Sequence, residues 1–237
     1  MKISVIVPAF NEERLLASSL KAIIEACRVF ESTELIVCDN NSTDRTAEIA
    51  RAAGARVVFE PVNQISRARN AGAAAASGDW LVFVDADSFP SRELFTDMAD
   101  AIRTGNVLAG GSTVAFVNAE LAPKLIVALW NVTSRITQWA AGSFVFCETA
   151  AFRELGGFSD ALYAAEEIDL SRRLKRLARR RGRRLVILHR HPLLTSDRKA
   201  RLYSWGEMAL FTLKTITGRG RTLRSRNECY SWYDGRR

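Results

Sequence analysis

The sequence is poor in the residues that define several structural classes. Its 237 residues include only five prolines, four cysteines and two histidines, and no low-complexity tract or internal repeat interrupts them. The cysteines lie far apart without a Cys-x-x-Cys pair, which argues against a zinc site or a disulfide framework and favours reduced thiols. With 48% hydrophobic and 25% charged residues, the composition is that of an ordinary soluble globular protein.

Long hydrophobic runs are also lacking. The first apolar segment, residues 3–7, is too short for the core of a signal peptide, so we expect no export. Residues 125–130 are apolar, but Lys124, Asn131 and Arg135 interrupt the run well short of the roughly 20 residues that a spanning helix needs. These absences predict a cytoplasmic protein without a transmembrane segment.

Charge is unevenly distributed along the chain, whose net charge is +8. Residues 1–171 carry 14 Lys and Arg against 22 Asp and Glu, whereas residues 172–237 carry 20 against four. The basic C-terminal quarter could attract an anionic membrane face, a phosphorylated substrate or nucleic acid, or it could be a solvated helix face. Nucleic acid is not the partner we expect, and a peripheral contact with the inner membrane face remains an option.

Apolar runs and amphipathic segments alternate through the first half of the chain. Strands are expected at residues 3–7, 34–38, 56–59 and 80–84, and helices at residues 13–30, 43–53, 68–77 and 92–104. Asn11 and the run Ser42-Thr43-Asp44 are the expected N-caps of the first two helices. This order predicts βαβ crossovers and a parallel sheet. The second half is less regular, with strands expected at residues 107–117, 142–147 and 184–188 and helices at residues 122–139, 168–181 and 199–217.

Two carboxylates follow the fourth expected strand. Asp85 and Asp87 flank Ala86 at its carboxyl end, which is the edge where ligands bind in open parallel sheets. Mg²⁺ and Mn²⁺ prefer oxygen ligands, and either ion there would make a diphosphate a better leaving group. A surface turn is the alternative interpretation. His191, two residues after His189, could complete the metal shell, although a histidine at a strand end is more often structural.

Polar residues also follow the neighbouring strands. Asp39 ends the second strand, and with the backbone of Asn41 it faces the same crevice, where its carboxylate could accept from the N–H of a base such as uracil or guanine. These residues could equally shape the turn and cap the next helix. Arg67 and Arg69 lie in an alanine-rich segment, where a guanidinium could reach a pyrophosphate, hold a site carboxylate or form an ordinary surface salt bridge.

Three acidic residues, Glu166, Glu167 and Asp169, open an expected helix. Their charges are favourable at a helix N-terminus, which accounts for all three without any function. A functional interpretation needs one carboxylate to remove a proton from an attacking hydroxyl, as a general base does. The composition does not choose between these interpretations.

Four spaced blocks point to one known family. They read Val-Ile-Val-Pro-Ala-Phe-Asn-Glu at residues 5–12, Asp-Asn-Asn-Ser-Thr-Asp-Arg-Thr at 39–46, residues 67–72 with 79–87, and Gly-Gly-Phe at 156–158 with Glu-Glu-Ile-Asp-Leu at 166–170. In this order the sequence resembles the family 2 glycosyltransferases over roughly residues 1–190. The resemblance implies an α/β fold of the GT-A type, with a mostly parallel central sheet, helices on both faces and a single nucleotide-sugar-binding domain. It implies a donor half at about residues 1–105 and an acceptor half at about 106–190, and we expect residues 191–237 to pack on this domain as a basic helical extension.

The resemblance also implies residue roles. Residues expected at the donor site are Pro8, Ala9, Glu12, Asp39, Asn41, Arg67, Asp85, Ala86 and Arg198, with Arg198 and Lys199 closing over the diphosphate. Asp87 would be the main metal ligand, with Asp85 on ribose or metal. The catalytic base would be Glu167, where the family usually has Asp, so Glu166 remains a competing candidate. Asn40-Asn41 replaces the commoner Asp-Gly.

The implied reaction is an inverting transfer of a sugar from a nucleoside diphosphate, with UDP favoured over GDP, to an unknown acceptor hydroxyl, assisted by Mn²⁺ or Mg²⁺. A dinucleotide-dependent oxidoreductase does not fit, because Pro8-Ala9-Phe10-Asn11 follows the first strand in place of a glycine-rich turn. The alternative that stays open is a non-catalytic nucleotide-sugar-binding or membrane-docking module.

Overall fold

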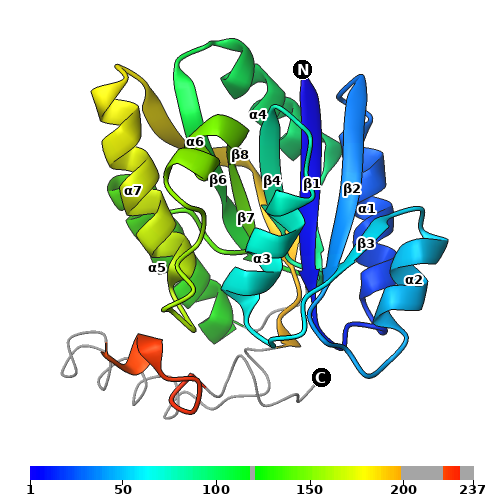
Figure 1. Ribbon diagram of the computed structural model, residues 1–237. Helices are drawn as coiled ribbons and strands as arrows, with labels where there is room; N and C mark the ends of the chain where they lie inside the picture. Colours follow the sequence, from blue (N-terminus) through cyan, green and yellow to red (C-terminus); the bar gives the residue numbers. More distant parts are fainter. Residues whose placement is uncertain (118–120, 199–220, 230–237) are drawn as a thin grey trace.

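A computed structural model describes residues 1–117, 121–198 and 221–229 (Figure 1). The strands are β1 (Lys2–Ala9), β2 (Ser32–Asp39), β3 (Arg56–Phe59), β4 (Trp80–Val84), β5 (Ser88–Phe89), β6 (Val107–Phe116), β7 (Phe144–Glu148) and β8 (Arg184–Thr195). The helices are α1 (Leu16–Cys27), α2 (Thr46–Ala52), α3 (Ile65–Ala74), α4 (Arg92–Arg103), α5 (Leu121–Thr137), α6 (Thr149–Glu154) and α7 (Glu166–Arg180), followed by the 3-10 turn η1 (Arg221–Arg224).

All eight strands form one sheet in the order β3-β2-β1-β4-β7-β6-β8-β5. The strands of the first half, β1 to β4, pair in parallel, as their spacing predicts. In the second half β7 runs antiparallel to both of its neighbours, and β5 runs antiparallel to β8, while β6 and β8 are parallel. The sheet is therefore mixed, and its unbroken run of four parallel strands lies in the half that was expected to hold the donor.

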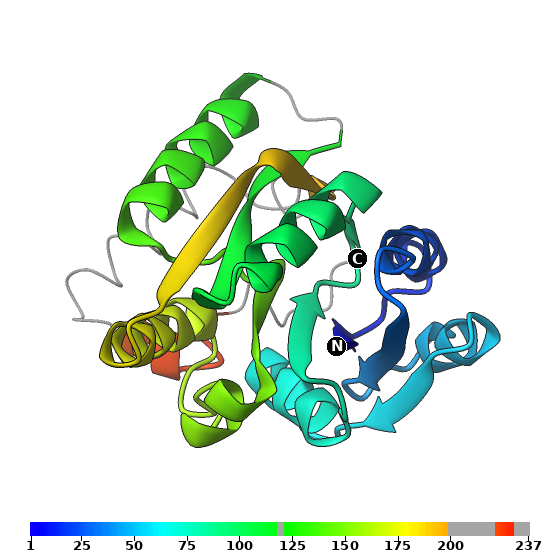
Figure 2. The same ribbon diagram turned by 90° about the horizontal axis from the view of Figure 1, so that it is seen from above.

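Helices cover both faces of the curled sheet, as expected (Figure 2). Apolar side chains of α1 and α4, such as Leu20 and Phe95, pack with Val5 and Val82 on one face. Those of α3, α6 and α7, such as Leu170, pack on the other face. β4 is buried throughout and β1 is buried from Ile3 onward, because both strands lie in the middle of this sandwich. Burial on both faces explains their apolar runs.

Several elements differ from the sequence-based expectation. β8 extends to Thr195, seven residues past its expected end at Leu188, because it pairs with β6 and β5 over this stretch. The expected boundary between residues 190 and 191 therefore falls inside a strand. α3 begins at Ile65, earlier than expected, and α6 and β5 were not anticipated. The helix expected at residues 199–217, Lys199, and the terminal segment 232–237 lie outside the described residues.

The prediction that Asn11 caps the first helix is wrong. α1 begins at Leu16, and the residue before it, Leu15, makes no side-chain cap hydrogen bond. Asn11 adopts a left-handed conformation with φ 52°, and its side-chain oxygen accepts from the backbone N–H of Thr43 at 2.8 Å. The amide therefore joins the loop after β1 to the loop after β2, which a reading of local capping signals does not reveal.

A glycine sets how closely α3 approaches the sheet. A Cβ on Gly72 would lie 2.5 Å from Cγ2 of the fully buried Ile6 on β1. Gly72→Ala should therefore lower the free energy of unfolding by about 1–3 kcal/mol. In a helix interior with open space around the glycine, the same exchange raises the free energy of unfolding by about 1 kcal/mol. The sign of the change therefore shows whether α3 approaches β1 this closely. Urea denaturation measures the difference, and an unchanged or increased stability would contradict the close approach.

Candidate active site

A pocket of about 270 Å³ opens at the carboxyl ends of the central strands. Residues lining it come from α3, the turn after β4, the ends of β6 and β8, the loop before β7 and the start of α7: Ile65, Arg69, Asp85, Asp87, Phe116, Gly142, Ser143, Ala165, Glu166, Glu167, Thr195 and Ser196. The structure thus brings both expected metal carboxylates and both candidate bases into one cavity. The edge of the sheet is the one that parallel topology predicts for a ligand.

Arg69 is a buried residue that lines this pocket. Its side chain is 1% exposed, and one terminal nitrogen, Nη1, donates to Glu166 Oε1 at 2.6 Å. The other, Nη2, donates to Asp85 Oδ1 and to the carbonyl of Gly142, both at 2.9 Å. The guanidinium therefore connects the turn after β4 to the N-terminus of α7. The planar fork of arginine suits this arrangement, because it presents several donors in fixed directions.

Two local features allow this contact. Gly142 carries no Cβ, and one placed there would lie 3.3 Å from Arg69 Nη2 and 3.2 Å from Glu167 Cδ. Ala165, directly before α7, adopts a left-handed conformation with φ 60°, which turns the chain into the helix. Non-glycine residues in this region are strained, and such strain concentrates at functional sites. Neither residue was singled out from the sequence, where both resemble ordinary small residues.

The two glutamates at the start of α7 have different surroundings. Both line the pocket, but Glu166 is buried and ion-paired with Arg69, whereas Glu167 is partly exposed. Burial, reinforced by the adjacent charge of Glu166, raises the pKa of the Glu167 carboxyl although Arg69 opposes the change. A raised pKa makes the deprotonated carboxylate a stronger proton acceptor, although below about pH 8 most of the group is protonated.

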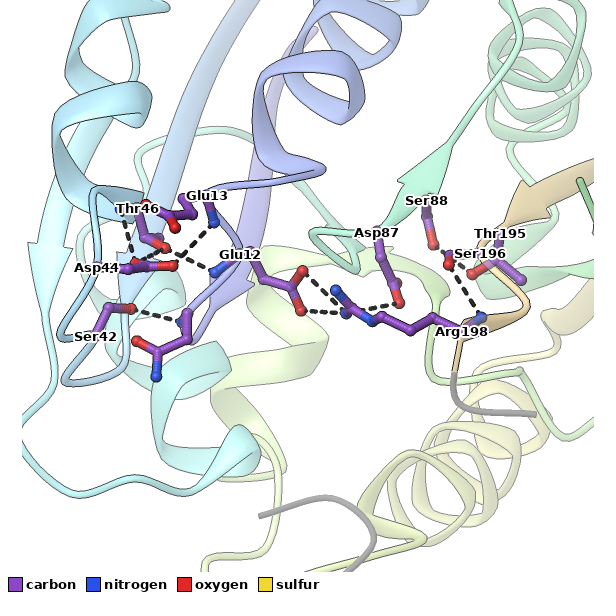
Figure 3. Close-up of polar contacts among 11 residues, drawn as sticks. Glu12, Glu13, Ser42, Asp44, Thr46, Asp87, Ser88, Thr195, Ser196 and Arg198 are labelled. Atoms are coloured by element: carbon purple, nitrogen blue, oxygen red, sulfur yellow. Dashed lines mark hydrogen bonds and ion pairs between the residues drawn. The ribbon is translucent and has the colours of Figure 1, made fainter. Parts of the chain in front are cut away.

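The loops after β1 and β2 are fastened together by hydrogen bonds (Figure 3). Three consecutive N–H groups of the first loop donate to side chains of the second: Asn11 to Ser42 at 3.0 Å, Glu12 to Thr46 at 2.8 Å, and Glu13 to Asp44 at 3.1 Å. Asp44 also accepts from the N–H of Thr46, at the start of α2. The Ser-Thr-Asp run predicted to start a helix therefore also fixes the backbone that carries Glu12.

Arg198 crosses from the end of β8 to this fastened loop. Its Nη2 donates to Glu12 Oε1 and Oε2 at 2.7 and 3.0 Å and lies 3.6 Å from Asp87 Oδ2 (Figure 3). Ser196 fixes the strand end, because its N–H donates to the carbonyl of Asp87 at 3.0 Å. A cation thus lies between two carboxylates that were assigned to the donor and metal sites from the sequence.

The remaining expected donor residues lie at the ends of β1, β2 and β4. Ala9 pairs in register with Asp39, next to Pro8, and all three are buried. Asp39 accepts from the N–H of Ser42 at 3.1 Å, and Asn41 follows in a left-handed conformation, so both shape the turn as the alternative interpretation held. Ala86 is buried in the core between Asp85 and Asp87.

Two further expected site residues, Arg67 and His191, are not among those that line the pocket. Arg67 is 40% exposed and pairs with Glu60 at 3.3 Å, which is the ordinary surface salt bridge weighed above. Its neighbour Arg69 is the arginine that reaches the pocket. His191 is exposed on β8, and its Nδ1 lies 3.0 Å from Asp97 on α4, so it does not line the cavity that holds Asp87.

The carboxylates at the pocket suit a divalent ion held jointly with a phosphate ligand. Within residues 1–117, 121–198 and 221–229, no three His, Cys, Asp or Glu side chains gather into a metal cluster. A pair is nevertheless sufficient, because Mg²⁺ usually takes one or two carboxylates together with substrate phosphates. Arg69 contacts Oδ1 of Asp85, whose side chain is 20% exposed. The carboxylate oxygens at the pocket therefore fit a Mg²⁺ or Mn²⁺ ion that binds together with a diphosphate.

Comparison with known proteins identifies the family. The family model described as Glycosyl transferase family 2 matches residues 4–153, from β1 into α6. The chain belongs to this family. The sequence-based recognition is therefore confirmed, and the matched residues include Arg69, Asp85 and Asp87 but end before Glu166.

Curated relatives share the transferase description. The probable glycosyltransferase YdaM of Bacillus subtilis is 27% identical over 199 residues, covering 74% of this chain and 47% of that protein. The dolichol-phosphate mannosyltransferase of Pyrococcus furiosus is 33% identical over 120 residues, covering 47% of this chain and 33% of that protein. The chain thus spans less than half the length of either relative.

Solved structures confirm the GT-A fold. S. aureus TarS 1-349 in complex with UDP-GlcNAc superposes with a TM-score of 0.68 at 21% identity, covering 98% of this chain and 69% of that one. Glucosyl-3-phosphoglycerate synthase from Mycobacterium tuberculosis, in complex with Mn²⁺, UDP and glucosyl-3-phosphoglycerate, gives 0.64 at 25% identity, covering 92% and 79%. The chain therefore combines membership of glycosyltransferase family 2 with the GT-A fold.

Removing the buried guanidinium should destabilise the protein strongly. Arg69→Gln leaves Glu166 buried without its cation, and we expect a loss of about 3–5 kcal/mol in the free energy of unfolding. Arg67→Gln is the matched control two residues away, and its exposed pair should contribute less than about 1 kcal/mol. Chemical denaturation of both variants tests this difference, and equal losses would show that the buried contacts carry no special weight.

The raised pKa of Glu167 predicts a pH-dependent stability. Because the folded protein holds this proton up to about pH 8, against an ordinary value of 4.5, the free energy of unfolding should fall as pH rises through that window. Glu167→Gln removes the titrating group, so wild type should lose stability relative to this variant between those two pH values. Glu31→Gln, at an exposed position, is the control and should track the wild type. If the difference in the free energy of unfolding between wild type and Glu167→Gln does not change across this pH range, the assignment is wrong.

Proposed function

We propose that this protein is an inverting, metal-dependent hexosyltransferase that moves a sugar from a nucleoside diphosphate, with UDP favoured, to an acceptor hydroxyl. The observation that carries the proposal is the meeting of Asp85, Asp87 and Glu167 in one pocket at the carboxyl edge of the sheet. The solved relatives that hold UDP-GlcNAc or UDP with Mn²⁺ support a nucleotide sugar and a divalent ion as ligands. Asp39, at the end of β2, is proposed to bind the nucleotide base.

Glu167 is the proposed catalytic base. Glu166 accepts a strong charge-assisted hydrogen bond from Arg69 and is buried, so it serves as the anchor of the buried guanidinium. Glu167 lines the cavity at a partly exposed position, and its raised pKa makes its deprotonated form a strong acceptor for the proton of the attacking hydroxyl. The additional methylene relative to the usual Asp extends the reach of the carboxylate, and the absence of a side chain on Gly142 provides the space.

Cationic groups would stabilise the departing diphosphate. Mn²⁺ or Mg²⁺, held by Asp87 and Asp85, would supply Lewis-acid neutralisation of the phosphate charge. Arg198 is the protein's own cation at the same place, since it already pairs with Glu12 and lies next to Asp87. We propose that Arg198 binds the diphosphate, while the fastened loop that holds Glu12 keeps its guanidinium in position.

Nucleotide binding tests the donor site. Calorimetric titration of UDP and GDP should show one nucleotide that binds in the presence of Mn²⁺ and much more weakly in its absence. Asp87→Asn should abolish the effect of Mn²⁺, because the main proposed metal ligand loses its charge. Asp97→Asn, whose side chain faces His191 away from the pocket, is the control and should retain it. If neither nucleotide binds under any condition, the proposed donor site is wrong.

Turnover tests the assignment of the base. Glu167→Gln should bind the nucleotide as wild type does and lower the rate of donor hydrolysis or transfer by at least about a hundredfold. Donor hydrolysis without an acceptor can be followed by release of the nucleoside diphosphate, which a non-catalytic binding module would not produce above background. A Glu167→Gln variant with the wild-type rate would exclude Glu167 as the base.

A further inference from the structure

Helix α5 exposes more large apolar side chains than any other element in the described part of the chain. The residues are Leu125, Ile126, Leu129, Val132 and Ile136. Leu125, Leu129 and Ile136 are 71, 68 and 76% exposed. The outer face of a helix on a water-facing surface is normally polar, and a contiguous apolar face marks an interaction surface.

The orientation of α5 is fixed by its inner face. Val127 and Trp130 pack against the core, and the side chain of Asn131 exchanges hydrogen bonds with the backbone of Val114 on β6, at 3.0 and 2.9 Å. Spacings of four, three and four residues separate Leu125, Leu129, Val132 and Ile136, so these side chains share one face of the helix. That face therefore points away from the sheet and cannot rotate inward.

Exposed apolar side chains also lie beside the pocket. Val117, just after β6, and Leu194 on β8 are both exposed. The N–H of Val117 donates to the carbonyl of Thr195 at 3.2 Å, so these two strand ends are joined. Thr195 and Phe116, which lies directly before Val117, line the pocket. Exposed apolar groups therefore occur both on α5 and at the strand ends next to the pocket.

Cations flank this face at both ends. Residues 121–137 contain no Asp or Glu, and Lys124 and Arg135 are exposed along the helix. Beyond its C-terminal end, Arg172 stacks 4.5 Å over the ring of Trp139, and Lys175 donates to the carbonyl of Thr137 at 2.9 Å. An apolar stripe bordered by Lys and Arg is typical of helices that lie in the interface of an anionic bilayer. Two copies of this basic face would repel each other, which argues against a second chain as the occupant.

We propose that the exposed face of α5 docks on the surface of an anionic lipid bilayer. Leu125, Leu129, Val132 and Ile136 would enter the boundary between headgroups and acyl chains, and Lys124 and Arg135 would contact the headgroups. The contact is peripheral, because no helix among the described residues is long and apolar enough to span a membrane. This docking goes beyond the proposed transfer reaction and does not depend on its donor chemistry.

Sedimentation with lipid vesicles tests the docking surface. The wild-type protein should bind vesicles of phosphatidylcholine with phosphatidylglycerol, more tightly than phosphatidylcholine alone, and should bind less tightly when salt is raised. The double variant Leu129→Ser with Ile136→Ser should bind at least about tenfold more weakly. The control, Ile24→Ser with Val62→Ser, removes two exposed apolar side chains elsewhere and should bind as wild type does.

A second variant separates weaker binding from a loss of folding. Lys124→Glu with Arg135→Glu alters only exposed charges, and it should also weaken binding to the anionic vesicles while leaving thermal unfolding unchanged. UDP binding measured on the same variants separates a failure of docking from a failure of the donor site. The proposal is overturned if wild type does not bind anionic vesicles, or if both α5 variants bind as wild type does. It is equally overturned if light scattering shows a wild-type dimer that Leu129→Ser with Ile136→Ser converts to monomers.

Discussion

A single buried guanidinium holds the two sides of the site together. Arg69 on α3 donates to Asp85 after β4 and to Glu166 at the start of α7, so one side chain joins the donor half to a helix 97 residues farther along the chain. Burying such a group is costly unless its charge and hydrogen bonds are matched. Two carboxylates and the carbonyl of Gly142 compensate the charge and the two terminal nitrogens, whereas Nε has no hydrogen-bond partner among the described residues. Asp85 and the start of α7 are thereby held at the same pocket.

The electrostatics of the pocket follow from this contact. Glu166 is paired with Arg69, which leaves Glu167 as the acidic group whose charge is poorly compensated and whose pKa is raised. On the opposite side Arg198 compensates Glu12 and approaches Asp87. An excess of carboxylates with two resident arginines favours a ligand that brings its own negative charge together with a divalent cation, as a nucleotide sugar with Mg²⁺ or Mn²⁺ does.

The sequence predicted much of the fold because its signals were local. The buried run of β4 and the βαβ spacing of the first half predicted the four parallel strands and the edge at which Asp85 and Asp87 lie, although β1 and β2 are longer than expected. The mixed second half was less readable, because the antiparallel position of β7 depends on long-range pairing. β8 likewise continues past Leu188 only because β6 and β5 pair with it.

The site residues were predicted less completely, because their positions also depend on long-range packing. Arg67 and Arg69 are two residues apart on one helix, and only the packing of α3 against β1 decides which of them faces the pocket. His191 has the chemistry of a metal ligand, but the length of β8 places it next to Asp97. The roles of Gly142 and Ala165 follow from close contacts and from backbone conformation, which their residue types do not indicate.

The titration of the Glu167 carboxyl tests this account most directly. In protein labelled with carbon-13 at its glutamate carboxyls, the signal that disappears in Glu167→Gln can be followed as a function of pH. The account predicts that this carboxyl titrates well above the ordinary glutamate value of 4.5, because burial and the charge of Glu166 outweigh the opposing charge of Arg69. A titration at the ordinary value would contradict the buried arrangement around Arg69 and remove the physical basis for Glu167 as the base.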